Sequence, residues 1–378
     1  DKEHIGAELV SSTFIRIQDL INTLMNSTNN GGSLHMSITY SPKEALDEDT
    51  KASPSTNADT PYLPIFEGLT DCTDSGPYIP PRAWIDVYNA IQKAQRFIYI
   101  TGWSVATGIN LVRDNPEIDS EGDSNVGELL KRKAEEGVTV LILIWSEKLS
   151  SEENPGLMGT HDEETRLFFH DTAVKCLSVA RVKYESLLAS EFVSSCYTHH
   201  QKTIIMDTDP EEEGQLRRIM AFRGLDITDG RYDSPEFPLF NTLCGPKHCG
   251  DFYNNCVTGA TKELGPREPW HDCHAKIEGP AALDVMKNFE ERWRRQADYH
   301  VNDLYHVEDD VIDRGAIPEV PSSEGGPWTV QLFRSITSDA CVFDFEGQKY
   351  LHSKGGRLVE NSILPKRFLY FENQYFLG

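Results

Sequence analysis

The segment from His200 to Asp207 has the spacing H-x-K-x-x-x-x-D, which occurs once in the chain. Residues two apart on an extended strand point to the same face, so His200 and Lys202 would present an imidazole and an ammonium to one spot. A neutral imidazole can attack phosphorus and hold the phosphoryl group covalently. The ammonium would neutralise the phosphate oxygens as negative charge builds on them. The pair is therefore suited to a phosphate diester.

The third residue of the motif, Asp207, has a different expected role. It lies seven residues beyond His200, which on a strand places it on the opposite face and about 23 Å away. It therefore cannot orient the imidazole, and we expect a structural role at the end of the strand. His199 also differs in parity from His200, so we expect it to point into packing.

Hydrophobic periodicity predicts the elements that must position this pair. Predicted helices cover residues 82–95, about 125–136 and 280–295. Predicted strands cover residues 97–101, 138–145, 174–179, 202–207 and 216–222. The run at 138–145 is apolar on both faces, as in a strand that is covered on both sides. Helices that alternate with strands predict an α/β layered sheet flanked by helices.

The two ends of the chain are less regular. Residues 34–40 alternate apolar and polar, which predicts a half-buried strand, whereas residues 43–80 are rich in Pro, Asp, Ser and Thr and predict a loop or linker. The segment 367–374 is similar to 96–103, which favours duplication of the fold over two unrelated aromatic strands. At the offset seen in the first copy, a second motif would fall beyond Gly378. We therefore expect one near-complete half of a pseudo-twofold duplicated fold.

The net charge of −24 limits the partners. Basic residues that neutralise phosphates supply most nucleic-acid affinity, so we expect no nucleic-acid partner. The charge also disfavours unassisted docking on an anionic membrane, so an acidic protein that works on phospholipids needs a local basic patch or a bridging cation such as calcium. The longest apolar run, residues 138–145, is too short to span a bilayer. The start lacks Met and a signal peptide, which indicates an internal piece of a longer protein.

Three further clusters each allow two interpretations. Cysteines and histidines between Cys244 and His274 resemble a zinc site, but their spacing matches no standard one, and free thiols are favoured. The acidic run Asp162-Glu163-Glu164 is suited either to calcium or, as we favour, to a helix N-terminus. The arginines at 292–295 are expected to form a solvated helix face rather than a lipid-headgroup site.

Several stretches carry a family resemblance. They are Ile98 to Ser104, Thr160 to Thr165, Asp229 to Asp233, Gly265 to Asp272, Ile277 to Pro280 and Glu372 to Phe376. The segment from His200 to Asp207 resembles the catalytic motif of the phospholipase D superfamily, and the other stretches resemble the plant-type enzymes that hydrolyse phosphatidylcholine. The resemblance spans about residues 34 to 378, as a fragment with the first of two such motifs.

This resemblance implies a mechanism. Two motifs face each other across a pseudo-twofold axis; one His forms a phosphohistidine, and the other protonates the leaving alcohol and then activates water. Carried over, His200 would be the nucleophile, Lys202 the phosphate clamp and Asp207 a structural acid. The implied products are phosphatidic acid and choline, and alcohols can replace water in transphosphatidylation.

The resemblance also implies calcium as a cofactor, with no ligands assigned, a phospholipid membrane surface as partner, and a cytoplasmic, peripheral-membrane location. Because cationic, aromatic and His side chains often contact substrate near a phosphate site, we expect Arg231, Trp270 and His271 to bind it; packing of a loop is the alternative for Trp270, His271 and His274. The implied domains are a β-sandwich tail with linker at 1–42, a linker or loop at 43–80, the first catalytic half at 81–327, and a truncated second half at 328–378.

Three departures from the family pattern shape the expected activity, one of which is that Pro365 leaves no room for the helix expected before Phe368. The missing second motif removes a general acid, which typically costs about 10²- to 10⁴-fold, and Arg223 brings bulk where the family usually has glycine. We therefore expect the fragment alone to be nearly inactive. A non-catalytic phospholipid-binding relative and a homodimeric single-motif phosphodiesterase are the alternatives. The pair His352 and Lys354 is taken as a coincidence, since Val359 stands where the motif requires Asp.

Overall fold

The computed structural model describes a large central part of the chain and several short strands outside it. The described residues are 13–14, 36–39, 51–56, 82–113, 124–151, 154, 156, 158–181, 198–210, 213–234, 237–245, 247–254, 259–307, 311–313, 329–332, 334, 336, 340–342 and 368–369.

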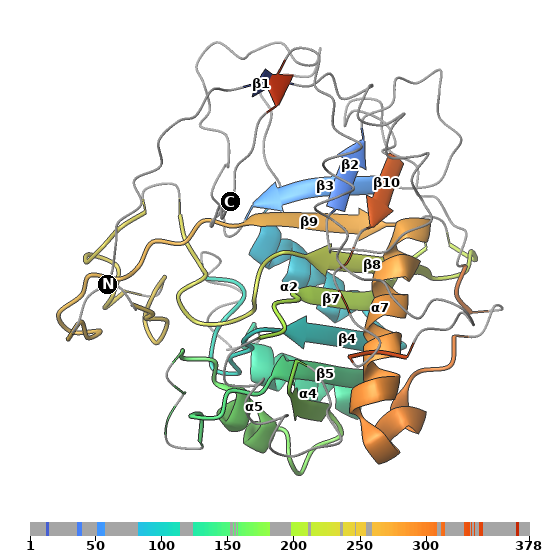
Figure 1. Cartoon of the computed structure of the whole chain (residues 1–378), viewed down its shortest axis with the longest axis horizontal. Helices are drawn as coiled ribbons and strands as arrows, with labels where there is room; N and C mark the ends of the chain where they lie inside the picture. The colour runs from blue at the N-terminus through green and yellow to red at the C-terminus, as the bar shows by residue number, and fades with distance from the viewer. Residues whose placement is uncertain are drawn as a thin grey trace.

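A seven-stranded mixed sheet forms the centre of the molecule, in the order β3-β9-β8-β7-β4-β5-β6 (Figure 1). Its strands are β3 (Lys51–Thr56), β4 (Phe97–Gly102), β5 (Thr139–Trp145), β6 (Lys175–Val179), β7 (Thr203–Thr208), β8 (Arg218–Arg223) and β9 (Cys273–Glu278). The trio β4, β5 and β6 is parallel, and the other neighbours are antiparallel. The predicted α/β layered sheet flanked by helices is confirmed.

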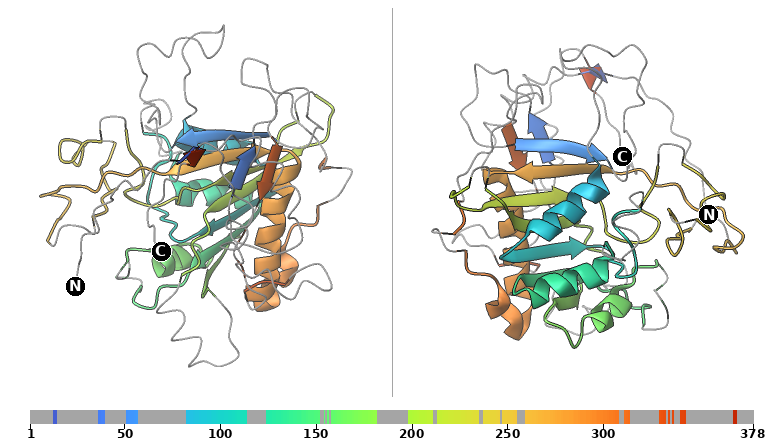
Figure 2. Two further views of the ribbon diagram at one scale, coloured as in Figure 1. Left: turned by 45° about the horizontal axis from the view of Figure 1, so that its top comes forward. Right: turned by 180° about the vertical axis from the view of Figure 1, so that it is seen from behind.

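Helices cover both faces of this sheet. The helices α2 (Ala83–Lys93), α4 (Val126–Glu135) and α5 (Asp162–Phe168) lie on one face, which the rear view in Figure 2 shows. The long helix α7 (Pro280–Gln296) packs on the other face, followed by the 3-10 turn η1 (Asp298–Asp303). Local sequence explains the ends, because the Asn125 side chain accepts a hydrogen bond from Glu128 N (3.1 Å) and Pro280 occupies the first turn of α7.

The alternation of side chains along the strands divides the apolar interior into two cores. Ile204 and Met206 of β7 point to the core beneath α2 and α4, whereas Ile205 between them points to the core beneath α7. Because β4, β5 and β7 are buried along nearly their whole length, the strand that carries the motif is fixed on both faces.

The expected linker at 43–80 was wrong in one part. Residues Lys51–Thr56 form strand β3, which pairs with β9 at the edge of the main sheet. Its polar composition and Pro54 are typical of a loop. An edge strand tolerates both, because one side of its backbone needs no partner.

Two small sheets lie outside the main one. Strand β2 (Met36–Thr39), inside the predicted strand 34–40, pairs with β10 (Thr329–Leu332), and β1 (Thr13–Phe14) pairs with β11 (Phe368–Leu369). The copy of β4 at 367–374 therefore contributes its described residues to a separate pair of strands. The predicted domain boundaries rest largely on residues outside those described and stay predictions, as does the second half of the fold.

One end of the main sheet gathers the loops that matter for chemistry. Antiparallel pairing brings the end of β4 beside the start of β7, and the end of β8 beside the starts of β7 and β9. The parallel pairing of β5 with β4 places the end of β5 there too. We call this the site end of the sheet. None of the described helices has both the length and the apolar content for a membrane span.

Candidate active site

His200 and Lys202 lie at the site end, immediately before β7. The strand begins at Thr203, one residue after its predicted start, so His200 and Lys202, which were expected on the strand, precede it. The exposed His200 ring meets the Trp103 ring edge-on with 6.3 Å between centroids. Lys202 Nζ donates to the His200 carbonyl oxygen at 3.4 Å. The ammonium is thus held against the backbone of His200, close enough for its charge to act on the imidazole.

A buried carboxylate, Asp226, holds Lys202 in place. Its Oδ2 lies 3.1 Å from Lys202 Nζ, while its Oδ1 accepts hydrogen bonds from the backbone amides of Trp103 and Ser104 at 3.0 and 3.3 Å. Asp226 follows β8, and Trp103 follows β4, so residues far apart in sequence meet only through the sheet register. The sequence alone assigned Asp226 no role.

The electrostatic surroundings keep His200 neutral. Enclosure by the surrounding protein and the charge of Lys202 lower its pKa, Asp226 opposes this by raising it, and Arg231 lowers it further. A pKa below the ordinary value of about 6.5 leaves the imidazole unprotonated at neutral pH. An unprotonated imidazole is the form that can act as a nucleophile.

Arg231 is enclosed by aromatic rings next to this pair. Its guanidinium carbon lies 4.0 Å from the ring centroid of Trp270, 4.4 Å from that of Tyr253 and 5.6 Å from that of Trp103. Its Nη1 donates to the Asp229 carbonyl oxygen at 3.0 Å. The side chain is buried, so its charge reaches His200 from within the packed wall.

Trp270, which was expected to bind substrate, lies in the same wall, and His271, which was also expected to bind it, follows Trp270 in the chain. The backbone amide of Trp270 donates to Asp233 Oδ2 at 2.7 Å, and its indole Nε1 donates to Asp272 Oδ2 at 2.6 Å. Burial raises the pKa of Asp272, and this outweighs the hydrogen bond from Trp270 and the charge of Lys202, which lower it. His271 is exposed, and its ring lies 6.2 Å from that of Phe237.

His274, the alternative contact of that loop, belongs to the packing. It is buried, its ring stacks on Phe222 with 5.7 Å between centroids, and its Nδ1 accepts from Leu225 N at 3.1 Å. Burial lowers its pKa to about 4. His199 is also buried, as its parity predicted, and burial together with the charge of Arg292 lowers its pKa.

Asp207 lies at the other end of β7 and is fully buried. Its carboxylate accepts hydrogen bonds from the backbone amides of Gln95, Arg96 and Phe97 at 2.8–3.3 Å, and it pairs with Arg217 Nε. These bonds join the end of β7 to the turn between α2 and β4. The contacts agree with the structural role that its position in the motif implied.

Arg292 does not belong to a solvated helix face. It is buried, its Nη1 donates to Gln201 Oε1 at 2.6 Å, and Gln201 Nε2 donates to Asn288 Oδ1 at 2.6 Å. Burial lowers the pKa of Arg292 to about 10. The cause is the position of residue 292 on the side of α7 that faces the segment before β7. The residue between His200 and Lys202 is thereby fixed to α7.

Arg223 also differs from expectation. It pairs with Thr203 in the β7–β8 register, whereas Gly224 N donates to the Lys202 carbonyl oxygen at 3.1 Å. Alternation then directs the Arg223 side chain to the face opposite that of Lys202. Gly224 has φ +120°, and a Cβ there would lie 2.1 Å from the Cys273 carbonyl oxygen. The close backbone approach therefore falls on Gly224, and glycine is required at that position.

The carboxylates considered for calcium are occupied within the protein. Asp162 accepts from Glu147 N, Thr160 Oγ1 and Ser178 Oγ, Glu163 pairs with Arg166, and Glu164 accepts from His161 Nδ1 at 2.8 Å. They begin helix α5, as favoured. In the described part of the chain, no three His, Cys, Asp or Glu side chains are grouped for a metal ion. These residues do not fit a calcium site.

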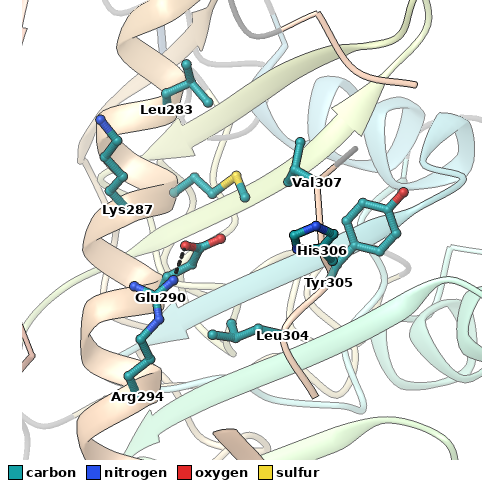
Figure 3. A pocket seen from close by; sticks show the side chains of 9 residues that line it. Leu283, Lys287, Glu290, Arg294, Leu304, Tyr305, His306 and Val307 are labelled. Carbon is teal, nitrogen blue, oxygen red and sulfur yellow. Dashed lines mark hydrogen bonds and ion pairs between the residues drawn. The ribbon is translucent and has the colours of Figure 1, made fainter. Parts of the chain in front are cut away.

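One cavity of about 350 Å³ lies away from this site, between α7 and residues 304–307 (Figure 3). Leu283, Met286, Leu304 and Val307 give it apolar walls, with Lys287, Glu290 and Arg294 along the helix. Neither His200 nor Lys202 contributes to its lining.

Comparison with known proteins places the chain. The family model described as phospholipase D matches residues 90–378. The chain belongs to the phospholipase D family. It is 42% identical over 343 residues to phospholipase D alpha 1 of rice (Oryza sativa), covering 84% of this chain and 41% of that protein. It is 44% identical over 329 residues to phospholipase D beta 2 of Arabidopsis thaliana, covering 79% of this chain and 35% of that protein.

This phospholipase D family chain therefore spans about two fifths of the length of the curated relatives it matches. Among solved structures, it is similar to Nuc, a phospholipase D family member from Salmonella typhimurium, with a TM-score of 0.32 and 10% sequence identity. That match covers 66% of this chain and 97% of Nuc. The resemblance to plant-type phospholipases D, predicted from the motifs, is confirmed by the identities to the plant enzymes.

Proposed function

We propose that this chain supplies the nucleophilic half of a phospholipase D active site that acts on phosphatidylcholine-type phospholipids. The observation that carries the proposal is the exposed, neutral His200 imidazole beside a Lys202 ammonium that buried Asp226 fixes in place. A nitrogen of His200 attacks phosphorus, the new N–P bond replaces the bond to the headgroup oxygen, and the headgroup leaves as the alcohol once it gains a proton. Lys202 neutralises the phosphoryl oxygens during this exchange.

The second step returns the enzyme. Water attacks phosphorus, the N–P bond breaks, and phosphatidic acid leaves; an alcohol in place of water gives transphosphatidylation. Both steps need a proton donor and acceptor beside the phosphate, and we assign that role to a second motif contributed from outside this chain. Loss of such an acid typically costs about 10²- to 10⁴-fold. We therefore propose that the chain alone is nearly inactive in turnover.

Arg231, Trp270 and His271 are proposed to line the headgroup side of this site. Arg231 acts through its charge from within the aromatic wall, and the exposed His271 is the member open to a ligand. We propose a phospholipid membrane surface as partner, no nucleic acid, and a cytoplasmic, peripheral location. Calcium is proposed as a cofactor of the longer protein through ligands other than Asp162, Glu163 and Glu164, and no step above depends on it.

Covalent trapping tests the proposal directly. The purified chain is incubated with a soluble phosphodiester labelled with ³²P in its phosphoryl group, quenched in alkali, and examined for acid-labile phosphohistidine. We expect labelling of the wild type that is absent in His200→Ala and retained in His170→Ala, which removes an exposed histidine before β6, at the opposite end of the sheet. Equal labelling of wild type and His200→Ala would reject the proposal.

The same assay separates the two alternatives. Turnover that tracks with dimer formation on a sizing column would favour the homodimeric phosphodiesterase. Vesicle or headgroup binding with no trace of phosphohistidine would favour a non-catalytic phospholipid-binding relative.

A further inference from the structure

Exposed large apolar side chains gather at the site end of the sheet. Seven such residues occur among the described residues, and five of them lie in the loops that follow β5 and β8 at this end. These five are Leu149, Met158, Leu239, Phe240 and Leu264. Single exposed apolar residues are ordinary on a protein surface, but a concentration around one site marks a surface that contacts something.

Three of these residues form one patch, which we call the apolar rim: Leu239, Phe240 and Leu264. They are 43%, 56% and 70% exposed. The Leu239 carbonyl oxygen accepts from Arg267 N at 2.9 Å, and the Phe240 ring packs so close to Gly265 that a Cβ there would lie 2.7 Å from it. Since Leu264 precedes Gly265, the backbone segments that carry the three residues adjoin one another on the loops between β8 and β9, which project from one side of the sheet in Figure 1.

The apolar rim is braced on the same groups as the candidate active site. Arg267 Nη2 pairs with Asp233 Oδ2 at 2.9 Å, and the Trp270 amide donates to that oxygen at 2.7 Å. Both Arg267 and Asp233 are fully or nearly fully buried. The rim is therefore held by buried side chains at a fixed place relative to the wall beside His200.

Charge decides what this surface can contact. The net charge of −24 opposes docking by attraction to an anionic leaflet. Burial of apolar side chains at the boundary of headgroups and acyl chains needs no opposite charge, and its strength scales with the apolar area buried. A zwitterionic phospholipid surface fits both conditions, and it also presents the phosphodiester at headgroup depth.

We propose that Leu239, Phe240 and Leu264 insert into the boundary region of a zwitterionic phospholipid bilayer and set the height of His200 above it. The proposal rests on the proposed function for its choice of a lipid surface. It adds that docking is apolar: it is insensitive to salt and needs no calcium bridge.

Sedimentation with phosphatidylcholine vesicles tests this. The full chain is spun with vesicles in EDTA at 0.1 M and 0.5 M NaCl. We expect binding that changes less than twofold with salt. Leu239→Ser/Phe240→Ser/Leu264→Ser should weaken it at least tenfold. The matched control is Leu216→Ser, a 38% exposed apolar residue before β8 at the opposite end, which should leave binding unchanged.

A variant expected to strengthen vesicle binding tests the proposal even where the triple variant misfolds. Leu264→Trp adds apolar area suited to the interface, so it should strengthen vesicle binding by about threefold. The proposal is overturned by wild-type protein that stays in the supernatant, by binding that needs calcium or disappears in salt, or by unchanged binding of both rim variants.

The outcome is separable from that of the catalytic proposal. Trapping of phosphohistidine from a soluble diester does not require a bilayer, so the rim variants should label like wild type. Rim-dependent vesicle binding without labelling would reject the catalytic proposal and support insertion of the apolar rim. Labelling together with vesicle binding that the rim variants do not change would support the catalytic proposal and reject insertion of the rim.

Discussion

The two ends of the motif from His200 to Asp207 differ in burial and in hydrogen bonding. At one end, Asp207 is fully buried and its carboxylate accepts from three backbone amides and an arginine. At the other end, His200 is exposed, with a ring-edge contact to Trp103 and a neighbouring ammonium. One eight-residue motif thus contains a buried structural carboxylate with satisfied hydrogen bonds and a reactive pair whose imidazole is exposed to solvent.

This difference teaches that the motif is not a triad. The Asp207 carboxylate accepts hydrogen bonds from four donors, and it lies at the far end of the strand from the imidazole. The carboxylate that acts on the reactive pair is Asp226, from the end of a neighbouring strand. The spacing of His, Lys and Asp therefore combines a chemical requirement at one end of the motif with a folding requirement at the other.

The largest effect on chemistry is expected from His200→Asn. Because the imidazole is exposed, its loss should leave the free energy of unfolding within about 1 kcal/mol of wild type, while phosphohistidine formation disappears entirely. Urea unfolding and ³²P trapping measure the two quantities on the same samples. A variant that still labels, or that unfolds several kcal/mol earlier, would contradict the division between the ends.

Asp207→Ala should do the opposite. Removing the buried carboxylate leaves Arg217 Nε and three backbone amides without their acceptor, which costs about 3–5 kcal/mol of stability. The control is Asp209→Ala, which also removes a partner of Arg217 at 2.9 Å but is 44% exposed, and should cost less than about 1 kcal/mol. Urea unfolding of both variants decides; equal costs would show that Asp207 is not an anchor.

The sequence predicted the helices and strands better than it predicted the partners of the reactive pair, for a physical reason. The apolar runs of β4 and β5 and the cap Asn125 are local signals, and the predicted elements agree with the observed ones to within a few residues. Asp226, by contrast, reaches Lys202 only through the β7–β8 register. The polar edge strand β3 and the buried contact of Arg292 with Gln201 likewise depend on neighbours distant in sequence.

The site end also carries a pH-dependent contact, at His161. Burial lowers its pKa, but hydrogen bonds with Asp229 and Glu164 outweigh this and raise it to about 9. A folded-state pKa above the unfolded value of about 6.5 gives stability that is full below pH 6.5 and is lost as pH rises through about 9. With 21% of the side chain exposed, we expect His161→Gln to cost about 1–2 kcal/mol at pH 6.

Unfolding curves from pH 6 to 10 check this expectation. The gap between wild type and His161→Gln should close above pH 9. Glu164→Gln removes one of the same hydrogen bonds from the other side, so it should show a smaller gap over the same range. A gap that stays constant with pH would mean that His161 is not a charged partner of these carboxylates.

The smallest expected effect tests how finely the reactive end is tuned. Enclosure and Lys202 lower the pKa of His200, and Asp226 raises it. Lys202→Met should therefore move that pKa up toward about 6.5, and Asp226→Asn should move it further down. NMR titration of the His200 ring protons reports the shifts, with Lys131→Met, a half-buried lysine of α4, as the control. Shifts of the same sign in both variants would mean that Lys202 and Asp226 act on His200 by displacing it, and not through their charges.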